Sequence, residues 1–403
     1  MWVRCATRPA TATPRVVPVP LLHFRFVADA NDAVKEACGV FGVYAPGQPV
    51  SHLTFQGLYA LQHRGQESAG IAVSDTERIW VDRGMGLVST VFDEHRLAAL
   101  SGHLAVGHTR YSTTGSSTWQ NAQPVYRGME GHRFALAHNG NLVNTRELAA
   151  DAGLLPGTAT SDSDVVAELV AAELREADAA TTDADADGRS FERALVKVLP
   201  RLRGAFSFVL LDEEHLVGVR DPNGFRPLFL GSLDGGWVLA SETPALDVIG
   251  ATVVREVQPG EMVVIDSTGV RSVHPFPLDR VNPTLCAFEF VYFARPDGEL
   301  YGQSVHRVRQ RMGEELAAQA PVPADLVVPV PESSVPGAQG FARVSGIPYG
   351  DGFIKNRYIG RTFIAPSQEL RSRAVRMKLN PIKENVAGKR LVVVDDSIVR
   401  ATT

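Results

Sequence analysis

The chain has 403 residues, of which 44% are hydrophobic and 21% are charged, and its formal net charge is −5. This composition is ordinary for a soluble globular protein with two or three domains. The charge gives no reason to expect a nucleic acid or an anionic membrane as a partner, and no apolar run approaches the roughly 18 residues that span a bilayer. Three cysteines do not make a disulfide framework in so long a chain, so we expect a reducing, cytoplasmic environment.

Residues 1–37 are expected to be a leader or propeptide without regular structure. Four arginines precede the first acidic residue, Asp29, and prolines interrupt the apolar stretch that a secretory signal would need. An organellar transit peptide is one interpretation. An unstructured leader, or a start codon placed too far upstream, is the interpretation that we favour.

From Cys38 onward, short apolar segments alternate with glycine-rich turns, a pattern typical of closely spaced and largely antiparallel strands. The segments expected to form strands are CGVFGVYA, GIAVSD, RIWVDRG, LAVGHTRYST, RFALAHNGNL, AFSFVLLD, PLFLGSL, GWVLASE and EMVVID. Helical spacing of apolar residues predicts helices over Gln56–His63 and Ser163–Leu174. The Ala/Asp-rich stretch 176–189 is interpreted as a solvated loop. Residues 38–270 are therefore predicted to form one domain of sheets and helices.

The pattern changes after about residue 270, where prolines mark a crossover. Two continuous apolar runs, in DLVVPVP and KRLVVVDD, are separated by helical stretches, and this order predicts a parallel α/β sheet. Residues 271–403 are thus expected to form a second domain. We expect that domain to be incomplete, because the sequence stops in a loop that would normally lead into a helix.

Cys38, followed by Gly39 at the start of the first predicted strand, is the candidate nucleophile. A thiolate attacks an amide carbonyl well but needs a base. Cleavage before Cys38 would create an α-amine with a pKa of about 7.7–8.0, and this amine can act as the base near neutral pH. Taken alone, the residue is more simply interpreted as a buried core cysteine.

The motifs around Cys38 resemble those of the N-terminal-nucleophile glutamine amidotransferases. ACGVFGVY, LQHRGQESAGIAV, GHTRYSTTG, NAQPV and AHNGNL follow in that family's order, and TSDSD then precedes a helix. The resemblance implies an αββα sandwich in which Cys38 attacks the side-chain amide of glutamine, with Asn139 and Gly140 as the oxyanion hole. The glutamine-binding residues that it implies are Arg110, on the α-carboxylate, Asp162, on the α-ammonium group, Arg64 and Thr113.

Simpler interpretations of some of these residues stay open. Without the resemblance, Arg110 would be assigned to a surface ion pair and Asp162 to a helix cap. His63 and His138 either shape the site or only pack. RDPNGFRPL (220–228) also matches this group of enzymes, but its turn-forming composition is equally consistent with a structural role.

The end of the chain, RLVVVDDSIVRATT (390–403), carries two adjacent acids from an apolar strand into a loop rich in hydroxyl and N–H groups. Such acids can hold ribose hydroxyls or Mg²⁺, and such a loop can wrap a 5′-phosphate. The segment resembles the signature of type I phosphoribosyltransferases, although Ala401 stands where that family usually has glycine. The phosphoribosyl pyrophosphate site implied by the resemblance comprises Asp395, Asp396, Ser397, Arg400, Thr402, Thr403, Lys355, Arg357 and Glu332. The implied Mg²⁺ ligands are Ser333, Asp395 and Asp396.

Further segments select one family among these, the amidophosphoribosyltransferases. VPVPESSVPGAQGFA (328–342) resembles their pyrophosphate loop, and KNRYIGRTFI (355–364) resembles the flexible loop that closes over phosphoribosyl pyrophosphate. Tyr358 and Ile364 resemble residues that line an ammonia channel. The resemblance implies that glutamine and phosphoribosyl pyrophosphate give 5-phosphoribosylamine, glutamate and pyrophosphate, the first step of purine synthesis. It also implies purine nucleotides as inhibitors and a homo-oligomer, either a dimer or a tetramer.

CAFEFVYF, which begins at Cys286, resembles the first ligand site of a four-iron–four-sulfur cluster that some members of this family bind. Such a cluster needs four thiolates. The chain offers Cys5, Cys38 and Cys286, so the cluster cannot be completed within it. A free buried cysteine is an equally good interpretation of Cys286.

Two other functions are compatible with parts of the sequence. A glutamine–fructose-6-phosphate aminotransferase shares the first half, but it should carry sugar-isomerase domains in place of VVVDDSIVR. A non-catalytic phosphoribosyl-binding regulator would suit Ala401. The complete set of glutaminase motifs disfavours this second alternative, because a pure binding module has no use for them.

Overall fold

The computed structural model describes the backbone of residues 2–6 together with residues 38–111, 118–179 except 156 and 158, 189–356 and 378–397. The chain divides into a large unit, Asp29–Cys286, and a small unit made of Met1–Ala28 and Ala287–Thr403. The division falls later than the predicted boundary after residue 270. Residues 271–286 belong to the large unit because Phe276 is part of its core. In addition, Asn282 N donates to the carbonyl of Pro222 at 3.0 Å, and Thr284 N donates to the carbonyl of Asn223 at 2.8 Å.

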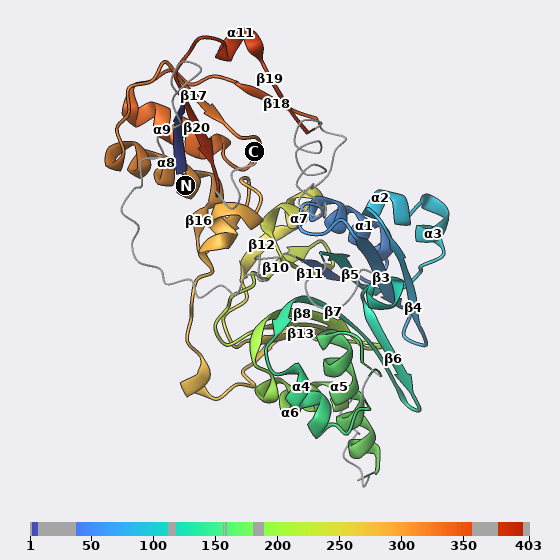
Figure 1. Ribbon diagram of the computed structural model, residues 1–403. Coiled ribbons are helices and arrows are strands. Elements are labelled where there is room, and N and C mark those ends of the chain that lie inside the picture. The colour runs from blue at the N-terminus through green and yellow to red at the C-terminus, as the bar shows by residue number, and fades with distance from the viewer. Residues whose placement is uncertain are drawn as a thin grey trace. The chain divides into compact units, whose positions relative to one another are not determined.

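The large unit contains two antiparallel sheets (Figure 1). The first has seven strands in the order β12-β10-β11-β2-β5-β3-β4, and the second has six in the order β14-β13-β9-β8-β7-β6. The seven strands of the first sheet are β2 (Gly39–Tyr44), β3 (Ser68–Ser74), β4 (Ile79–Met85), β5 (Leu104–Arg110), β10 (Phe229–Leu233), β11 (Gly236–Ala240) and β12 (Thr252–Glu256). The six strands of the second are β6 (Val125–Met129), β7 (His132–Leu142), β8 (Gly204–Leu211), β9 (Leu216–Arg220), β13 (Met262–Asp266) and β14 (Gly269–Val273).

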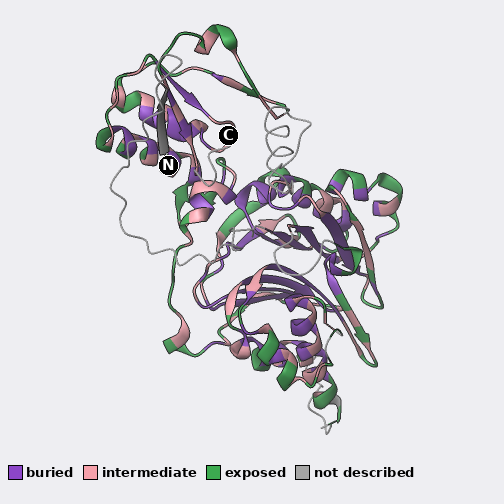
Figure 2. Ribbon diagram, viewed as in Figure 1, coloured by how far each residue is buried: buried purple, intermediate pink, exposed green. Residues whose placement is uncertain are grey.

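Side chains alternate along these strands between two apolar layers. The layer between the sheets includes Val40, Val106 and Ala137. The other face of the six-stranded sheet presents Phe134 and Phe206 to helices α5 (Asp162–Ala179) and α6 (Ser190–Val198). Helices α1 (Val50–Ala60) and α7 (Thr243–Val248) pack on the seven-stranded sheet, so the predicted αββα order of layers is confirmed. Figure 2 shows the central strands of both sheets buried, whereas the exposed residues lie mostly on the outer helices, the loops and the edge strands.

All the segments predicted as strands in this unit form strands, whereas β6, β9, β12 and β14 were not predicted. The helix expected over Gln56–His63 instead begins at Val50 and ends at Ala60. The helix expected over Ser163–Leu174 is part of α5, which continues to Ala179, inside the stretch predicted to be a loop. The shorter helices are α2 (Val88–Val91), α3 (Glu94–Ala98), α4 (Thr145–Asp151) and the 3-10 turns Trp119–Asn121, Leu199–Arg201 and Leu278–Arg280.

The small unit is built around β20 (Leu391–Asp395), which pairs in parallel with β17 (Leu326–Pro329), as the sequence predicts. On its other edge β20 pairs antiparallel with β1 (Trp2–Ala6), so part of the expected leader is a strand. Helices α8 (Val305–Gln319) and α9 (Val335–Ser345) pack on each other and contribute to a core with Val327 and Val392. The remaining elements are β15 (Glu299–Leu300), β16 (Gln303–Ser304), β18 (Phe353–Lys355), β19 (Leu379–Pro381), α11 (Lys383–Val386) and a π-helical turn at Glu289–Phe293. No helix in the described part of the chain has the length and apolarity needed to traverse a lipid bilayer.

Candidate active site

Cys38 lies at one end of the sandwich, immediately before β2. The pairing of Gly39 with Thr109 places it beside Arg110, the last residue of β5. Only 8% of Cys38 is exposed, and its Sγ lies 3.4 Å from the backbone N and 3.5 Å from the backbone O of Tyr111. The fold therefore holds the candidate nucleophile against the segment that also carries Arg110, the residue predicted to bind the α-carboxylate of glutamine.

A buried ion pair supports the backbone of Cys38. The Nε of Arg64 donates to the carbonyl of Cys38 at 3.2 Å, and its Nη1 contacts Glu242. The same carboxylate oxygen of Glu242 accepts from Nε2 of His63 at 2.7 Å. The side chains of Arg64 and Glu242 are 0% and 2% exposed. Arg64, predicted from the sequence as a glutamine-binding residue, thus holds the nucleophile's main chain, and Glu242 is a site residue that the sequence analysis missed.

Asn139 and Gly140 lie on β7, at the same end of the sandwich. Asn139 is fully buried, and neither Nδ2 nor Oδ1 has a hydrogen-bond partner among the described residues. Gly140 has φ of +149°, and a Cβ there would come within 2.0 Å of the carbonyl of Ala205, so only glycine fits. A buried amide without a partner is costly unless a ligand completes it, which suits the expected oxyanion hole.

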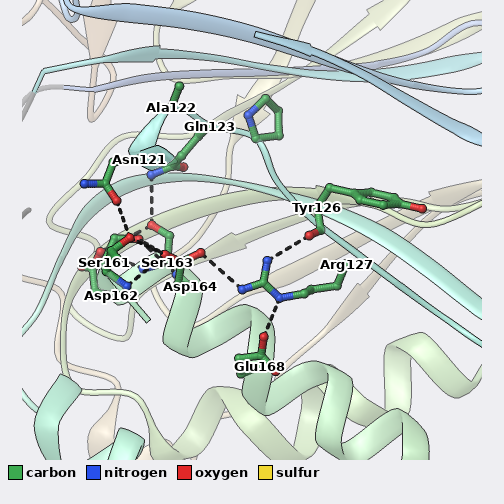
Figure 3. Close-up of polar contacts among 12 residues, drawn as sticks. Asn121, Ala122, Gln123, Tyr126, Arg127, Ser161, Asp162, Ser163, Asp164 and Glu168 are labelled. Carbon is green, nitrogen blue, oxygen red and sulfur yellow. Dashed lines mark hydrogen bonds and ion pairs between the residues drawn. The ribbon is translucent and has the colours of Figure 1, made fainter. Parts of the chain in front are cut away.

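Asp162 begins α5 and joins that helix to the end of β7. Its Oδ2 accepts from Leu142 N at 3.1 Å, and its Oδ1 accepts from Ser163 N at 2.8 Å. Nδ1 of His138 lies 3.6 Å from Oδ1. Burial alone would raise the pKa of Asp162, but His138 and the two N–H donors outweigh burial and hold the pKa below its ordinary value. Figure 3 shows this carboxylate beside Ser161 and Ser163 at the start of the helix.

His108, the second residue of the GHTRYST motif, is another residue to which the sequence analysis assigned no role. It is fully buried, and its Nε2 donates to the carbonyl of His138 at 3.0 Å. Burial lowers the pKa of His108 to about 3, so the ring is neutral at physiological pH.

In the small unit, Asp395 and Asp396 stand at the carboxyl end of β20. Ser333 Oγ donates to Asp396 at 2.5 Å, Ser397 Oγ donates to Asp396 at 2.8 Å, and Ser334 Oγ contacts Asp395 at 3.4 Å. Burial, with repulsion from Asp396, raises the pKa of Asp395 to about 6. The two adjacent acids therefore repel each other in half-buried surroundings.

Two further residues of the predicted phosphoribosyl pyrophosphate site lie on the next strands and loops of this unit. Lys355, at the end of β18, forms an ion pair with Glu332 at 3.1 Å. Glu332 belongs to the same loop after β17 as Ser333, so the loop that resembles the pyrophosphate loop contacts both the acids and Lys355.

Comparison with known proteins gives the family. Residues 108–248 match the model of the glutamine amidotransferase domain. The amidophosphoribosyltransferase of Mycobacterium leprae is 51% identical over 409 residues, which are 100% of this chain and 70% of that protein. The enzyme of the same name from Mycobacterium tuberculosis H37Rv is 54% identical over 377 residues, 92% of this chain and 69% of the relative. This chain belongs to the amidophosphoribosyltransferase family.

Solved structures agree with that assignment. The structure of the allosteric regulatory enzyme of purine biosynthesis matches with a TM-score of 0.80 and 41% identity, covering 91% of this chain and 76% of that one. The glutamine phosphoribosylpyrophosphate amidotransferase of Bacillus subtilis, complexed with ADP and GMP, matches with a TM-score of 0.79 and 41% identity, covering 90% and 76%. Membership of the amidophosphoribosyltransferase family decides against the sugar aminotransferase and the non-catalytic regulator considered from the sequence.

Several predicted residues lie outside the described part of the chain. They are Thr113 of the glutamine site, Arg357, Arg400, Thr402 and Thr403 of the phosphoribosyl pyrophosphate site, Ala401, and the expected channel residues Tyr358 and Ile364. Their roles stay predictions.

Mg²⁺ is the metal that the amidophosphoribosyltransferase family implies for the small unit. Carboxylate and hydroxyl oxygens are the protein ligands that Mg²⁺ prefers, with water and substrate phosphate completing its octahedral shell. Asp395, Asp396 and Ser333 supply such oxygens, and the raised pKa of Asp395 indicates excess negative charge that a cation would offset. These residues fit Mg²⁺.

The iron–sulfur cluster of some family members does not fit this chain. Four thiolates are needed, and the chain has three cysteines. Cys38 lies in the large unit beside Tyr111, and Cys286 is half-buried at the other end of that unit's sequence. Within the described residues, no group of three or more His, Cys, Asp or Glu side chains is arranged to hold a metal. No step of the reaction is therefore assigned to a cluster.

Proposed function

We propose that the large unit releases ammonia from glutamine at Cys38 and that the small unit holds phosphoribosyl pyrophosphate at Asp395 and Asp396 for attack by that ammonia. As an amidophosphoribosyltransferase, the chain is a glutamine-hydrolysing pentosyltransferase of purine synthesis. The observation that carries the residue assignment is the fully buried side-chain amide of Asn139, which has no hydrogen-bond partner among the described residues and lies beside Gly140, where only glycine fits.

The glutaminase steps follow from these positions. The Cys38 thiolate attacks Cδ of glutamine, and the negative charge that develops on the amide oxygen is stabilised by the N–H groups of Asn139 Nδ2 and Gly140. Collapse of this intermediate breaks the C–N bond, and the departing nitrogen takes a proton and leaves as ammonia. Water then hydrolyses the remaining thioester to glutamate and regenerates the thiol.

We further propose that residues 1–37 are removed, so that the α-amine of Cys38 takes the thiol proton and returns it to the leaving nitrogen. Its intrinsic pKa, about 7.7–8.0, suits such exchange near neutral pH. Arg110 would hold the α-carboxylate of glutamine and Asp162 its α-ammonium group. The lowered pKa of Asp162 supports this role, because the carboxylate is then charged when the substrate arrives.

In the small unit, the lone pair of ammonia forms a bond to C1 of phosphoribosyl pyrophosphate while the bond from C1 to the pyrophosphate oxygen breaks. Asp395 and Asp396 would hold the ribose hydroxyls, and Lys355 would face the pyrophosphate. Mg²⁺, when bound, neutralises charge on the departing pyrophosphate. The new C1 ammonium group then loses one proton to water, and the products are 5-phosphoribosylamine and pyrophosphate.

Three properties are inferred from the family and from composition. We propose purine nucleotides as inhibitors, since the Bacillus subtilis relative was solved with ADP and GMP. We propose a homo-oligomer, as the resemblance implies. A cytoplasmic location is inferred from the small number of cysteines.

The test is to determine the intact mass and N-terminal residue of the purified protein and then to label it with a diazoketone analogue of glutamine. We expect an N-terminal Cys38 that takes one label. Cys38→Ala should lose both the label and glutamine-dependent formation of phosphoribosylamine while keeping formation from added ammonia. A protein that hydrolyses glutamine with Cys38 replaced, or with the leader still attached, would overturn the assignment.

A further inference from the structure

The edge of β7 that leads to Asn139 lacks a neighbouring strand. Strand β6 pairs with β7 only up to Val125, which lies opposite Leu136. Continuing this register by two residues would set Gln123 opposite His138. The backbone pairing of β6 with β7 does not extend beyond Val125. The polar main-chain groups of His138 on this edge therefore need other partners.

Two side chains supply those partners. Gln123 Oε1 accepts from His138 N at 2.7 Å. The side chain of Gln123 thus takes the place of the backbone carbonyl that a longer β6 would offer to His138. His108 Nε2 donates to His138 O at 3.0 Å, from the β5 strand of the facing sheet. Gln123, His108 and His138 are 7%, 0% and 2% exposed, so water cannot replace either bond without opening the core.

The Gln123 side chain is itself fixed. Its Nε2 donates to Ser163 Oγ at 3.0 Å, as Figure 3 shows, and Ser163 Oγ lies 3.1 Å from Nδ1 of His138. These contacts close a ring of three residues, so the amide of Gln123 cannot rotate without breaking a second bond.

The main chain around Gln123 is fixed as well. A Cβ on Gly70 of β3 would lie 2.2 Å from Gln123 O, so glycine is needed for this close approach. Arg83 donates to the carbonyls on both sides of Gln123, those of Ala122 and of Pro124, the latter at 3.2 Å. Side chain and main chain together make Gln123 a rigid support.

We propose that Gln123 and His108 are positioning residues of the oxyanion hole, holding the N–H and C=O of His138 so that Asn139 Nδ2 and Gly140 N stay aimed at the developing charge. This inference rests on the proposed role of Asn139 and Gly140. It gives a role to the NAQPV motif and to the histidine of GHTRYST, to which the reaction scheme assigns none.

The consequence is specific to the transition state. Loss of an oxyanion donor costs about 100–1000-fold in rate, and a misplacement of about 1 Å costs about 100-fold. Substrate binding through Arg110 and Asp162 does not depend on where the oxyanion donors point. A change at Gln123 should therefore lower kcat and leave KM for glutamine nearly unchanged.

The experiment compares Gln123→Met, which keeps the shape but loses the acceptor, with Gln123→Glu, which keeps an acceptor for His138 N. For each variant, kcat and KM of glutamine hydrolysis are measured with the affinity for the γ-semialdehyde of glutamate. This aldehyde forms a hemithioacetal with Cys38 whose oxygen occupies the oxyanion hole, whereas L-glutamate binds without it. We expect Gln123→Met to lower kcat about 10–100-fold and to lower the affinity for the aldehyde by a similar factor, while the affinity for glutamate is unchanged. Gln123→Glu should keep most of kcat and most of the affinity for the aldehyde.

His108 is tested in the same way. His108→Gln keeps an N–H that can reach His138 O, and His108→Leu does not. We expect the first to retain most of kcat and the second to behave like Gln123→Met.

A matched control distinguishes positioning from general weakening of the fold. Asn144 is also buried and also bridges two backbone groups, accepting from Arg203 N at 3.0 Å and donating to Arg201 O at 3.0 Å, but it does not touch His138. Asn144→Leu should lower stability without the selective loss of aldehyde affinity. Urea unfolding followed by tryptophan fluorescence reports whether the large unit of each variant is folded, since Trp80, Trp119 and Trp237 lie in that unit.

The outcomes are separable. If Asn139→Ala leaves glutamine hydrolysis intact, the proposed oxyanion hole is wrong. If Asn139→Ala abolishes hydrolysis but Gln123→Met and His108→Leu do not lower kcat, or raise only KM, then the positioning role is wrong and the oxyanion hole stands.

Discussion

Glu242→Gln is expected to be strongly destabilising, although Glu242 is assigned no step of the reaction. It removes the negative charge that Arg64 contacts through Nη1 while preserving side-chain shape. Because the side chains of Arg64 and Glu242 are 0% and 2% exposed, the guanidinium left behind cannot be solvated by water. Two unit charges about 4 Å apart attract by about 4 kcal/mol at an effective dielectric constant of about 20. Breaking one partner of a buried pair typically costs about 3–5 kcal/mol.

We therefore expect Glu242→Gln to lower the free energy of unfolding of the large unit by about 3 kcal/mol or more. It should also reduce labelling of Cys38, because Arg64 holds the Cys38 carbonyl at 3.2 Å. Urea unfolding followed by tryptophan fluorescence measures the first effect, since Trp80, Trp119 and Trp237 lie in the large unit. The rate of inactivation by the diazoketone measures the second.

Asp82→Asn is the matched control. Asp82, like Glu242, contacts one guanidinium, that of Arg96, which it binds through both carboxylate oxygens. The side chain of Asp82 is 27% exposed and that of Arg96 is 37% exposed. Partly exposed pairs contribute about 1 kcal/mol or less. If Glu242→Gln costs no more than Asp82→Asn, burial does not make the Arg64–Glu242 pair essential and the reasoning fails.

Three further predictions follow from single contacts. The pKa of His108 is about 3 in the folded chain, against about 6.5 in the unfolded chain. Below about pH 6.5 the unfolded chain therefore binds a proton that the folded chain does not, and the free energy of unfolding falls by up to about 1.4 kcal/mol per pH unit. His108→Gln should remove this part of the pH dependence, as measured by urea unfolding at about pH 7 and about pH 5. Gly140→Ala would place a methyl group 2.0 Å from Ala205 O at a φ of +149°. It should lower the free energy of unfolding, measured in urea, by more than about 2 kcal/mol and abolish glutamine hydrolysis. Near-normal stability and activity would contradict the conclusion that only glycine fits at this position. Asp396→Asn removes one carboxylate from the proposed Mg²⁺ ligands, which also include Ser333. It should raise the Mg²⁺ concentration for half-maximal ammonia-dependent synthesis about tenfold or more and leave the labelling of Cys38 unchanged. An unaltered Mg²⁺ requirement would show that Asp396 is not a ligand of the metal.

The sequence predicted the parts of the fold whose signal is local. Apolar segments between glycine-rich turns located β2, β5 and β7 correctly, because alternation and turn chemistry are properties of neighbouring residues. The start of α1 was missed: Ser51, His52 and Thr54 weaken the apolar period of its first turns, although Ser51 and Thr54 are buried in the fold. Strand order was also out of reach, since β5 pairs with both β2 and β3 at long range.

The site shows the same division. Cys38, Asn139 and Asp162 belong to motifs that resemble those of the glutamine amidotransferases, and that resemblance identified them. Glu242 could not be found in this way, because its partner Arg64 is 178 residues away and the pair exists only once α7 packs beside α1. GWVLASE predicts a strand correctly and says nothing about the role of its last residue, Glu242. Residues that act by supporting other residues can be identified only from the tertiary contacts that they make.

The turn before β6 is where these supporting contacts converge. Gln123 binds the main chain of β7 through His138. It binds the start of α5 through Ser163 (Figure 3). Just before that helix, Asn121 Oδ1 accepts from Thr160 Oγ1 at 2.6 Å. Under the proposed assignment, β7 carries the group that stabilises the reacting end of glutamine, and α5 carries the carboxylate that holds its amino end. One short segment therefore fixes both elements. Because residues of a shared polar network do not act independently, the effects of substitutions combined within this turn should not be additive.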